Sequence, residues 1–226
     1  MRIDVLTIFP EMFPPVLESS ILARAAAKKV LRVRVHDLRD WSNDKHRKVD
    51  DRPYGGGPGM VMRADPFFLA VQQLKKKAGR LKAHVVLLSP QGEKLTQKKA
   101  QALAKKPWLV LLCGHYEGVD DRVRQKLASE ELSIGDYVLT CGELPAMVLI
   151  DSVVRLLPGA LGDERSAADE SFSGGLLEYP QYTRPAEFRG MRVPAVLLSG
   201  DASRVAEWRR LQSLRRTRAQ RPDLTR

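Results

Sequence analysis

The sequence predicts an α/β protein with a parallel sheet at its centre, for three reasons. Short apolar runs alternate with segments of helical periodicity along the first 157 residues. Three of these runs are almost free of polar residues, as expected of strands buried on both faces of a parallel sheet. A glycine-containing turn follows each of the three, and α/β proteins bind ligands at such strand ends. The three runs are His84–Ser89, Leu109–Cys113 and Leu132–Leu139.

The N-terminal segment contributes two more strands and a helix. Arg2–Phe9 and Leu31–His36 alternate between apolar and polar residues, which indicates strands. Prolines follow the first strand, and Val16–Lys29 has the pattern of an amphipathic helix.

Four further helices are predicted between and after the buried strands. Asp65–Lys77 begins with Asp65 as a candidate cap and Pro66 in its first turn. Thr96 is expected to cap a helix that runs to Lys106, and Val119–Ser129 is a shorter helix. Glu143–Leu157 is apolar nearly all round, which predicts a buried helix.

Two opposite charges lie on one face of that last apolar helix. Asp151 and Arg155 are four residues apart, so they could form an intrahelical ion pair. Because charges on a buried helix are costly unless they have a function, we expect instead that Arg155 faces the ligand pocket.

Residues 40–60 form a long polar loop, and such a loop inside a compact domain is usually either functional or disordered. Gly55–Gly57 and Gly59 allow close backbone approach, while basic residues offer donors to phosphates or base edges. These are Lys45, His46, Arg47, Lys48 and Arg52. The alternative is a mobile basic linker. No Walker phosphate-binding motif is present, because no Gly-Lys-Ser/Thr follows the glycines.

The charge of the chain predicts a polyanionic partner. The formal net charge is +11, and from Ala202 onward eight arginines face only two acidic residues. Small residues and glycines without periodicity follow Leu157, so we expect a first domain of residues 1–160, a linker of residues 161–172 and a mostly helical domain of residues 173–226.

No segment of the sequence is typical of a secreted or membrane protein. No apolar stretch is long enough to span a bilayer, and the N-terminus lacks the features of a signal peptide. Cys113 and Cys141 do not have zinc-ligand spacing, which favours reduced thiols in a cytoplasmic protein.

Seven short motifs occur in order along the chain. They are Asp50–Met60 (DDRPYGGGPGM), Leu88–Gly92 (LSPQG), Tyr116–Gly118 (YEG), Ser133–Leu139 (SIGDYVL), Gly142–Ala146 (GELPA), Tyr182–Pro185 (YTRP) and Val196–Gly200 (VLLSG). In this order they resemble the bacterial tRNA (guanine-N1)-methyltransferases of the knotted SPOUT class.

That resemblance implies a fold and an activity which periodicity alone does not predict. The α/β domain would carry a deep trefoil knot that binds S-adenosylmethionine, followed by a small helical tRNA-binding domain. The active form would be a homodimer that methylates N1 of guanine 37, the base 3′ of the tRNA anticodon. A role for magnesium is left open, and no metal ligand is predicted.

The resemblance also assigns residues to the site. For the cofactor they are Leu88, Ser89, Pro90, Gln91, Gly114, Glu117, Ile134, Gly135, Asp136, Tyr137, Val138, Leu139, Gly142 and Pro145. For the substrate RNA they are His46, Asp50, Arg52 and Gly59.

Catalysis requires a base, because N1 of guanine carries a proton at neutral pH. The resemblance places a carboxylate at the start of the C-terminal region, reaching the other subunit, and assigns Arg155 to the charge that develops on O6. The family pattern Glu-Asp-Ser-Phe reads Asp169-Glu170-Ser171-Phe172 here. Gapless register favours Glu170 as the base, and Asp169 is the alternative.

A second departure is Cys141, where the family usually has glycine. The two departures are the features that favour an RNA-binding protein without catalytic activity. A third hypothesis, an enzyme acting on small nucleotides, leaves the arginine-rich C-terminus unexplained.

Overall fold

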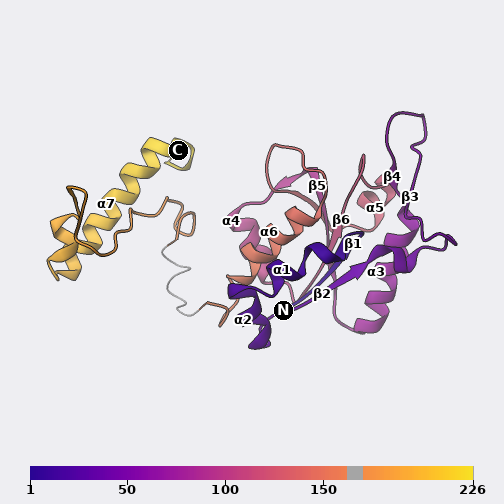
Figure 1. Cartoon of the computed structure of the whole chain (residues 1–226), viewed down its shortest axis with the longest axis horizontal. Coiled ribbons are helices and arrows are strands. Elements are labelled where there is room, and N and C mark those ends of the chain that lie inside the picture. The colour runs from indigo at the N-terminus through magenta and orange to yellow at the C-terminus, as the bar shows by residue number, and fades with distance from the viewer. Residues whose placement is uncertain (162–169, 226) are drawn as a thin grey trace. The chain divides into compact units, whose positions relative to one another are not determined.

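A computed structural model describes residues 1–161 and 170–225, and the chain separates into two compact units, residues 1–162 and 163–226. The first unit contains a parallel sheet with helices on both faces (Figure 1), so the prediction of an α/β fold is confirmed. Within the residues described, no helix is long and apolar enough to cross a membrane.

The central sheet has five strands in the order β2-β1-β6-β5-β7, and every neighbouring pair is parallel. Its members are β1 (Arg2–Thr7), β2 (Arg32–Asp37), β5 (His84–Lys94), β6 (Trp108–Cys113) and β7 (Glu130–Ser133). β6 is buried along its whole length. Because the strands are parallel, the loops that follow β5, β6 and β7 emerge at the same edge of the sheet.

Helices cover both faces of the sheet and form two cores (Figure 1). On one face lie α2 (Ser20–Ala27), α4 (Gln97–Ala104) and α6 (Glu143–Val154). On the other lie α3 (Ala64–Ala78) and α5 (Asp121–Lys126). This layering explains why β6 and Val85–Leu88 of β5 lack polar side chains, since neither face meets solvent.

Two strands differ in length from the prediction. β5 does not end at Ser89 but continues to Lys94, with a break in its pairing to β7 between Leu88 and Glu93. Pro90 lies in this break, where its missing N–H costs no ladder hydrogen bond. β7 was predicted to reach Leu139 but ends at Ser133, so the apolar residues after it belong to a loop.

Three predicted helices also need correction. The segment predicted as one helix from Val16 is split into α1 (Pro14–Leu17) and α2, with extended backbone at Ser19 between them. Asp65 does not cap α3; Arg63 occupies the cap position, and its guanidinium binds the Asp65 carboxylate. The helix after the β6 turn is limited to α5, which Asp120 caps.

α6 is less buried than its composition suggests. Most of its side chains are buried, but Leu144, Val148 and Asp151 are exposed and lie on one face at helical spacing. Leu144 and Val148 are 44% and 47% exposed, so α6 presents an apolar stripe to its surroundings.

A buried polar cluster links the neighbouring strands β2, β1 and β6. The carboxylate of Asp4 is fully buried and lies 2.6 Å from Arg2 Nε, 2.7 Å from His36 Nε2 and 2.8 Å from Trp108 Nε1. Burial disfavours the charged form, but the hydrogen bonds from His36, Arg2 and Trp108 outweigh it and lower the pKa of Asp4.

The second unit contains one long helix and much irregular chain. α7 (Ala202–Gln220) is capped by the Asp201 side chain, and β8 (Glu187–Phe188) pairs with β9 (Met191–Arg192) as a short hairpin. Apart from 3-10 turns, including η4 (Ala195–Leu198) and η5 (Pro222–Thr225), the rest of residues 170–225 is irregular. The prediction of a mostly helical region therefore holds only for its last part.

Candidate active site

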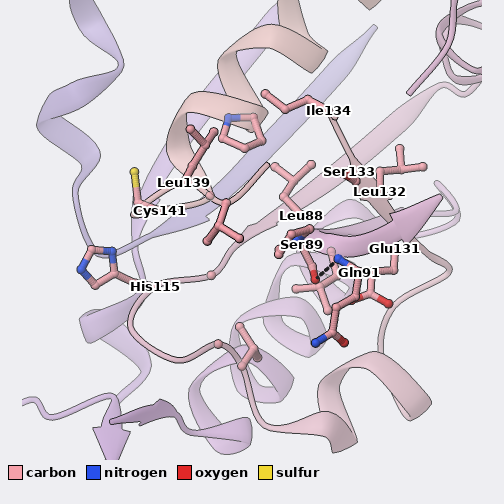
Figure 2. Close-up of a pocket in the computed structure, with 18 of the residues that line it drawn as sticks. Leu88, Ser89, Gln91, His115, Glu131, Leu132, Ser133, Ile134, Leu139 and Cys141 are labelled. Atoms are coloured by element: carbon pink, nitrogen blue, oxygen red, sulfur yellow. Dashed lines mark hydrogen bonds between the residues drawn. The ribbon is translucent and has the colours of Figure 1, made fainter. Parts of the chain in front are cut away.

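Three loops at the carboxyl edge of the sheet enclose a pocket of about 280 Å³ (Figure 2). They are the break in β5 around Ser89–Gln91, the turn of residues 114–118 after β6 and the loop of residues 134–142 after β7. Pro145 in the first turn of α6 completes the wall. Much of the lining is therefore loop backbone, whose N–H and C=O groups can recognise the edges of a base.

Gly142 and Gly114 hold two of these loops together. The N–H of Gly142 donates to the carbonyl of Gly114 at 2.8 Å, and Cys141 and His115 form an antiparallel bridge beside them. A Cβ on Gly142 would lie 2.7 Å from the Gly114 nitrogen and 2.8 Å from Cys113 Cα. Only glycine permits this approach, which puts the start of α6 directly against the end of β6.

The charge of the pocket is opposite to that of the whole chain. The acidic and basic residues among its lining are Glu117, Asp121 and Glu131 against Arg124, together with His115, whereas the chain has a net charge of +11. Arg124 is held by Asp121, with its Nε 2.6 Å from the carboxylate. The pocket therefore suits a ligand that carries positive charge, although the surrounding protein is basic.

A second layer anchors the long loop of residues 42–60 to the pocket. β3 (Asp50–Asp51) and β4 (Val61–Met62) form an antiparallel pair that closes residues 52–60, the last part of this loop. The N–H of Glu117 donates to the carbonyl of Met60, and the N–H of Met62 donates to that of Gly118. Gly59 has a φ of +76°, and a Cβ there would overlap the Glu117 carboxylate. The loop was expected to be irregular, but its C-terminal end is fixed beside the pocket.

The chain matches one protein family over its whole length. The model for tRNA (Guanine-1)-methyltransferase TrmD matches residues 1–226. The tRNA (guanine-N(1)-)-methyltransferase of Geobacillus kaustophilus (strain HTA426) is 60% identical over 224 residues, which is 99% of this chain and 91% of the relative. The enzyme of the same name from Bacillus pumilus (strain SAFR-032) is 56% identical over the same shares. The chain belongs to the tRNA (guanine-1)-methyltransferase family. The resemblance inferred from the seven motifs is thus confirmed.

All but one of the residues that the methyltransferase resemblance assigns to the cofactor line the pocket. They are Leu88, Ser89, Pro90, Gln91, Gly114, Glu117, Ile134, Gly135, Tyr137, Val138, Leu139, Gly142 and Pro145. The exception is Asp136, whose side chain is 83% exposed and pairs with Lys94 at 2.7 Å. Its carboxylate points away from the lining.

Several lining residues were not assigned from the sequence. Tyr116 lies within a motif, Val119, Thr140 and Cys141 neighbour the motifs, and Asp121 and Arg124 come from α5. The bridge between Cys141 and His115 brings Cys141 to the pocket wall, and this long-range contact has no local signal in the sequence. The α5 residues follow from helical spacing once the position of that helix is known.

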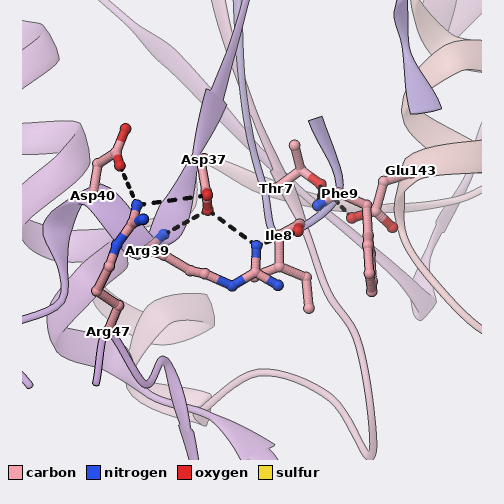
Figure 3. A network of polar contacts seen from close by, with 8 residues as sticks. All are labelled: Thr7, Ile8, Phe9, Asp37, Arg39, Asp40, Arg47 and Glu143. Carbon is pink, nitrogen blue, oxygen red and sulfur yellow. Dashed lines mark hydrogen bonds and ion pairs between the residues drawn. The ribbon is translucent and has the colours of Figure 1, made fainter. Parts of the chain in front are cut away.

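The residues expected to contact RNA in this methyltransferase occupy two different places. Asp50 and Gly59 do not line the pocket but neighbour two residues that do: Gly59 packs on Glu117, and the pKa of Tyr116 is raised first by burial and then by the charge of Asp50. His46 and Arg52 are exposed and do not line the pocket. Arg47, a further candidate donor, instead pairs with Asp40 (Figure 3). Its Nη2 also lies 3.6 Å from Asp37 Oδ2.

A buried carboxylate lies behind the pocket. Glu143, the first residue of α6, is fully buried and accepts a hydrogen bond from the hydroxyl of Thr7 at the end of β1 (Figure 3). Thr7 in turn accepts from the N–H of Phe9 at 2.9 Å. This chain of bonds ties the start of α6 to the carboxyl end of β1 and so fixes the back wall of the site.

The two cysteines differ in access. Cys113 is buried in β6, and burial first, then Glu143, raises its pKa well above the usual value. Cys141 is half-buried on the pocket wall, where burial and Glu143 also raise its pKa. Both groups are therefore thiols rather than thiolates at neutral pH.

Arg155, one of the catalytic candidates, does not line the pocket of its own chain. Arg155 directly follows α6, ten residues after the pocket residue Pro145, so it lies about 15 Å along the helix axis from that wall. The expectation that it faces this pocket is not met within one chain. Glu170 opens the described part of the second unit, and Asp169 lies outside the described residues. Residues 1–161 and 170–225 contain no group of three or more side chains suited to bind a metal ion.

Proposed function

We propose that this protein transfers a methyl group from S-adenosylmethionine to N1 of guanine 37, the base 3′ of the anticodon in tRNA. Family membership supports the reaction, and the match of the motif residues to the pocket supports its location. The observation that carries the proposal is the acidic, loop-lined pocket in an otherwise basic chain. The pocket suits a cationic ligand, and the basic remainder of the chain suits a polyanionic one.

The lining residues fit S-adenosylmethionine. The cradle between Gly142 and Gly114, which a Cβ would fill, leaves loop backbone free to recognise the adenine edge. Glu117, Asp121 and Glu131 would balance the positive sulfonium and ammonium groups. When bound, S-adenosylmethionine supplies a methyl group already activated for transfer. The close crossing of residues 141–142 over residues 113–115 supports a trefoil knot at this position.

The side chains would then act on the target base. The Glu170 carboxylate accepts the proton from N1 of guanine, which makes N1 nucleophilic. The Arg155 guanidinium donates to O6, where negative charge builds as that proton leaves. Asp50 and Gly59, at the pocket rim, and His46 and Arg52, in the same loop, position the base and its neighbour. Asp169 is the alternative base.

The distance between Arg155 and its own pocket favours a site shared between two chains. In a homodimer, Arg155 and Glu170 of one chain would complete the pocket of the other. The exposed apolar stripe of Leu144 and Val148 on α6, together with Val138, which is 82% exposed, supports a partner that covers this surface. The second unit, with its arginines, would hold the rest of the tRNA. Since tRNA is cytoplasmic, we place the reaction there.

A methyl-transfer assay tests this function. Labelled S-adenosylmethionine is incubated with a tRNA transcript that has guanine at positions 36 and 37, and the product is digested to nucleosides. We expect label in 1-methylguanosine, and none when position 37 is adenine. Tight tRNA binding without label would favour the alternative suggested by Glu170 and Cys141, an RNA-binding protein that does not catalyse. Label in free nucleotides would favour a small-molecule enzyme.

A further inference from the structure

A second cavity lies wholly within the C-terminal unit, and the proposed reaction does not use it. It encloses about 380 Å³ between α7, the segment of residues 179–186 and the turn that contains η4. Three aromatic residues and two arginines contribute to its walls: Tyr179, Tyr182, Trp208, Arg184 and Arg209. The YTRP motif supplies one side of this cavity, so the structure gives that motif a location but not yet a role.

One of the three aromatic rings is covered by an arginine, and the other two form a pair that is partly open. Arg209 lies over the ring of Tyr179, with its guanidinium carbon 4.7 Å from the ring centroid. Tyr182 and Trp208 are a tilted pair with centroids 6.4 Å apart, and Tyr182 is 50% exposed. Trp208 is half-buried on α7. Planar groups therefore face a cavity that solvent can enter.

The charge of this cavity selects the class of ligand. Among the described residues that line the cavity, none is acidic and two, Arg184 and Arg209, are basic. Across residues 170–225, ten arginines and no lysines accompany six acidic residues. Unstacked RNA bases bind on aromatic side chains and guanidinium planes, with basic groups near the phosphate. A peptide partner would not need both features.

We infer that this cavity is a nucleotide-binding subsite for a base of the tRNA outside the catalytic pocket. The inference rests on the proposed function, because it takes tRNA as the substrate. Tyr182 and Trp208 stack on the base, and Arg209 and Arg184 pair with its phosphate. The subsite adds tRNA affinity without contributing to S-adenosylmethionine binding, since it lies in the other unit of the chain.

The test compares matched pairs of variants for tRNA affinity, with and without S-adenosylmethionine. Tyr182→Ala removes a cavity aromatic, and Phe188→Ala removes an aromatic that is 56% exposed but does not line the cavity. We expect Tyr182→Ala to raise the dissociation constant for a full-length tRNA transcript at least about fivefold, since base stacking contributes that much. Phe188→Ala should change it less than about twofold. Affinity for S-adenosylmethionine should not change in either.

A pair of arginine variants distinguishes binding at this cavity from non-specific electrostatic attraction between the basic helix and tRNA. Arg209→Gln and Arg215→Gln each remove one exposed arginine of α7, but only Arg209 lines the cavity. We expect the larger loss for Arg209→Gln at the same salt concentration, and quenching of protein fluorescence by tRNA that disappears in Trp208→Phe. Equal losses within both pairs, with unchanged quenching, would overturn the inference. Methyl transfer by the unmodified protein would then still support the proposed function, whereas its absence would count against that function separately.

Discussion

The N–H of Gly142 donates to the carbonyl of Gly114 at 2.8 Å, although the two residues belong to different turns at the edge of the sheet. The bond fixes the start of α6 against the end of β6, and the pocket opens beside it. Any side chain at position 142 would separate these two elements.

Gly142→Ala should therefore damage the pocket. The added Cβ meets backbone atoms of residues 113 and 114, which cannot move aside as a flexible side chain can. We expect a loss of about 1–3 kcal/mol in the free energy of unfolding and a larger fractional loss of S-adenosylmethionine affinity, measured by denaturant unfolding and calorimetry. Gly174→Ala is the control, because a Cβ there meets no atom within 4 Å. Equal behaviour of the two variants would disprove the importance of this contact.

The two adjacent carboxylates can be distinguished by conservative substitution. Glu170→Gln should lower kcat by about 10²–10⁴-fold, because the amide cannot accept the N1 proton. S-adenosylmethionine affinity should hardly change, and the dependence of kcat on pH should lose its acidic limb. Asp169→Asn is the matched control. If it abolishes turnover and Glu170→Gln does not, then the register that favours Glu170 is wrong.

Cys141 makes the pocket accessible to thiol chemistry. Because burial and Glu143 raise its pKa, alkylation by a maleimide should be slow at neutral pH and accelerate as pH rises. S-adenosylmethionine should protect the thiol, since Cys141 lines the pocket. Cys141→Gly should abolish the labelling, because Cys113 is buried. Labelling that the ligand does not slow would mean that the thiol faces away from the bound molecule. The measurement is mass spectrometry of the intact protein.

The polar cluster around Asp4 should make stability depend on pH in the acidic range. The pKa of Asp4 is lower in the folded protein than in the unfolded chain, so the unfolded chain binds the proton more readily. The stabilisation is complete above the unfolded pKa of about 4 and is lost as pH falls through the folded pKa. Asp4→Asn should thus destabilise the protein at pH 7, and less so in acid.

Urea unfolding at a series of pH values measures this effect. Asp136→Asn is the control, because Asp136 is exposed and its pair with Lys94 is screened by solvent. A constant difference between Asp4→Asn and the unmodified protein at every pH would rule out the charge of Asp4 as the source.

The sequence predicted the centre of the fold better than its edges. A buried apolar run marks β6 clearly, because parallel strands covered on both faces exclude polar residues, and alternation of apolar and polar residues marks β1 and β2. The apolar residues after Ser133 follow the same pattern but line a pocket instead, so β7 was predicted too long. The exposed stripe on α6 has the composition of a core helix, and only its position in the fold reveals that Leu144 and Val148 are uncovered.

The site divided in the same way. Motif residues at the strand ends line the pocket as the resemblance implied, because their order along the chain fixes which loops meet. Asp136 lies within a motif yet turns outward, since its carboxylate has a lysine partner at the surface. Cys141 reaches the pocket wall through its bridge to His115, a contact between distant parts of the chain that leaves no trace in local composition.

The most direct test of the shared site is a mixed dimer. One chain carries Glu170→Gln and the other carries Gly142→Ala, so each homodimer is impaired in turnover or in cofactor binding. If the carboxylate acts on the pocket of the partner, then the mixed dimer contains one intact site. We predict that methyl transfer to guanine 37 recovers to about half that of the unmodified dimer, since one of two equivalent sites is complete. Activity no higher than that of the two variant homodimers would contradict the account.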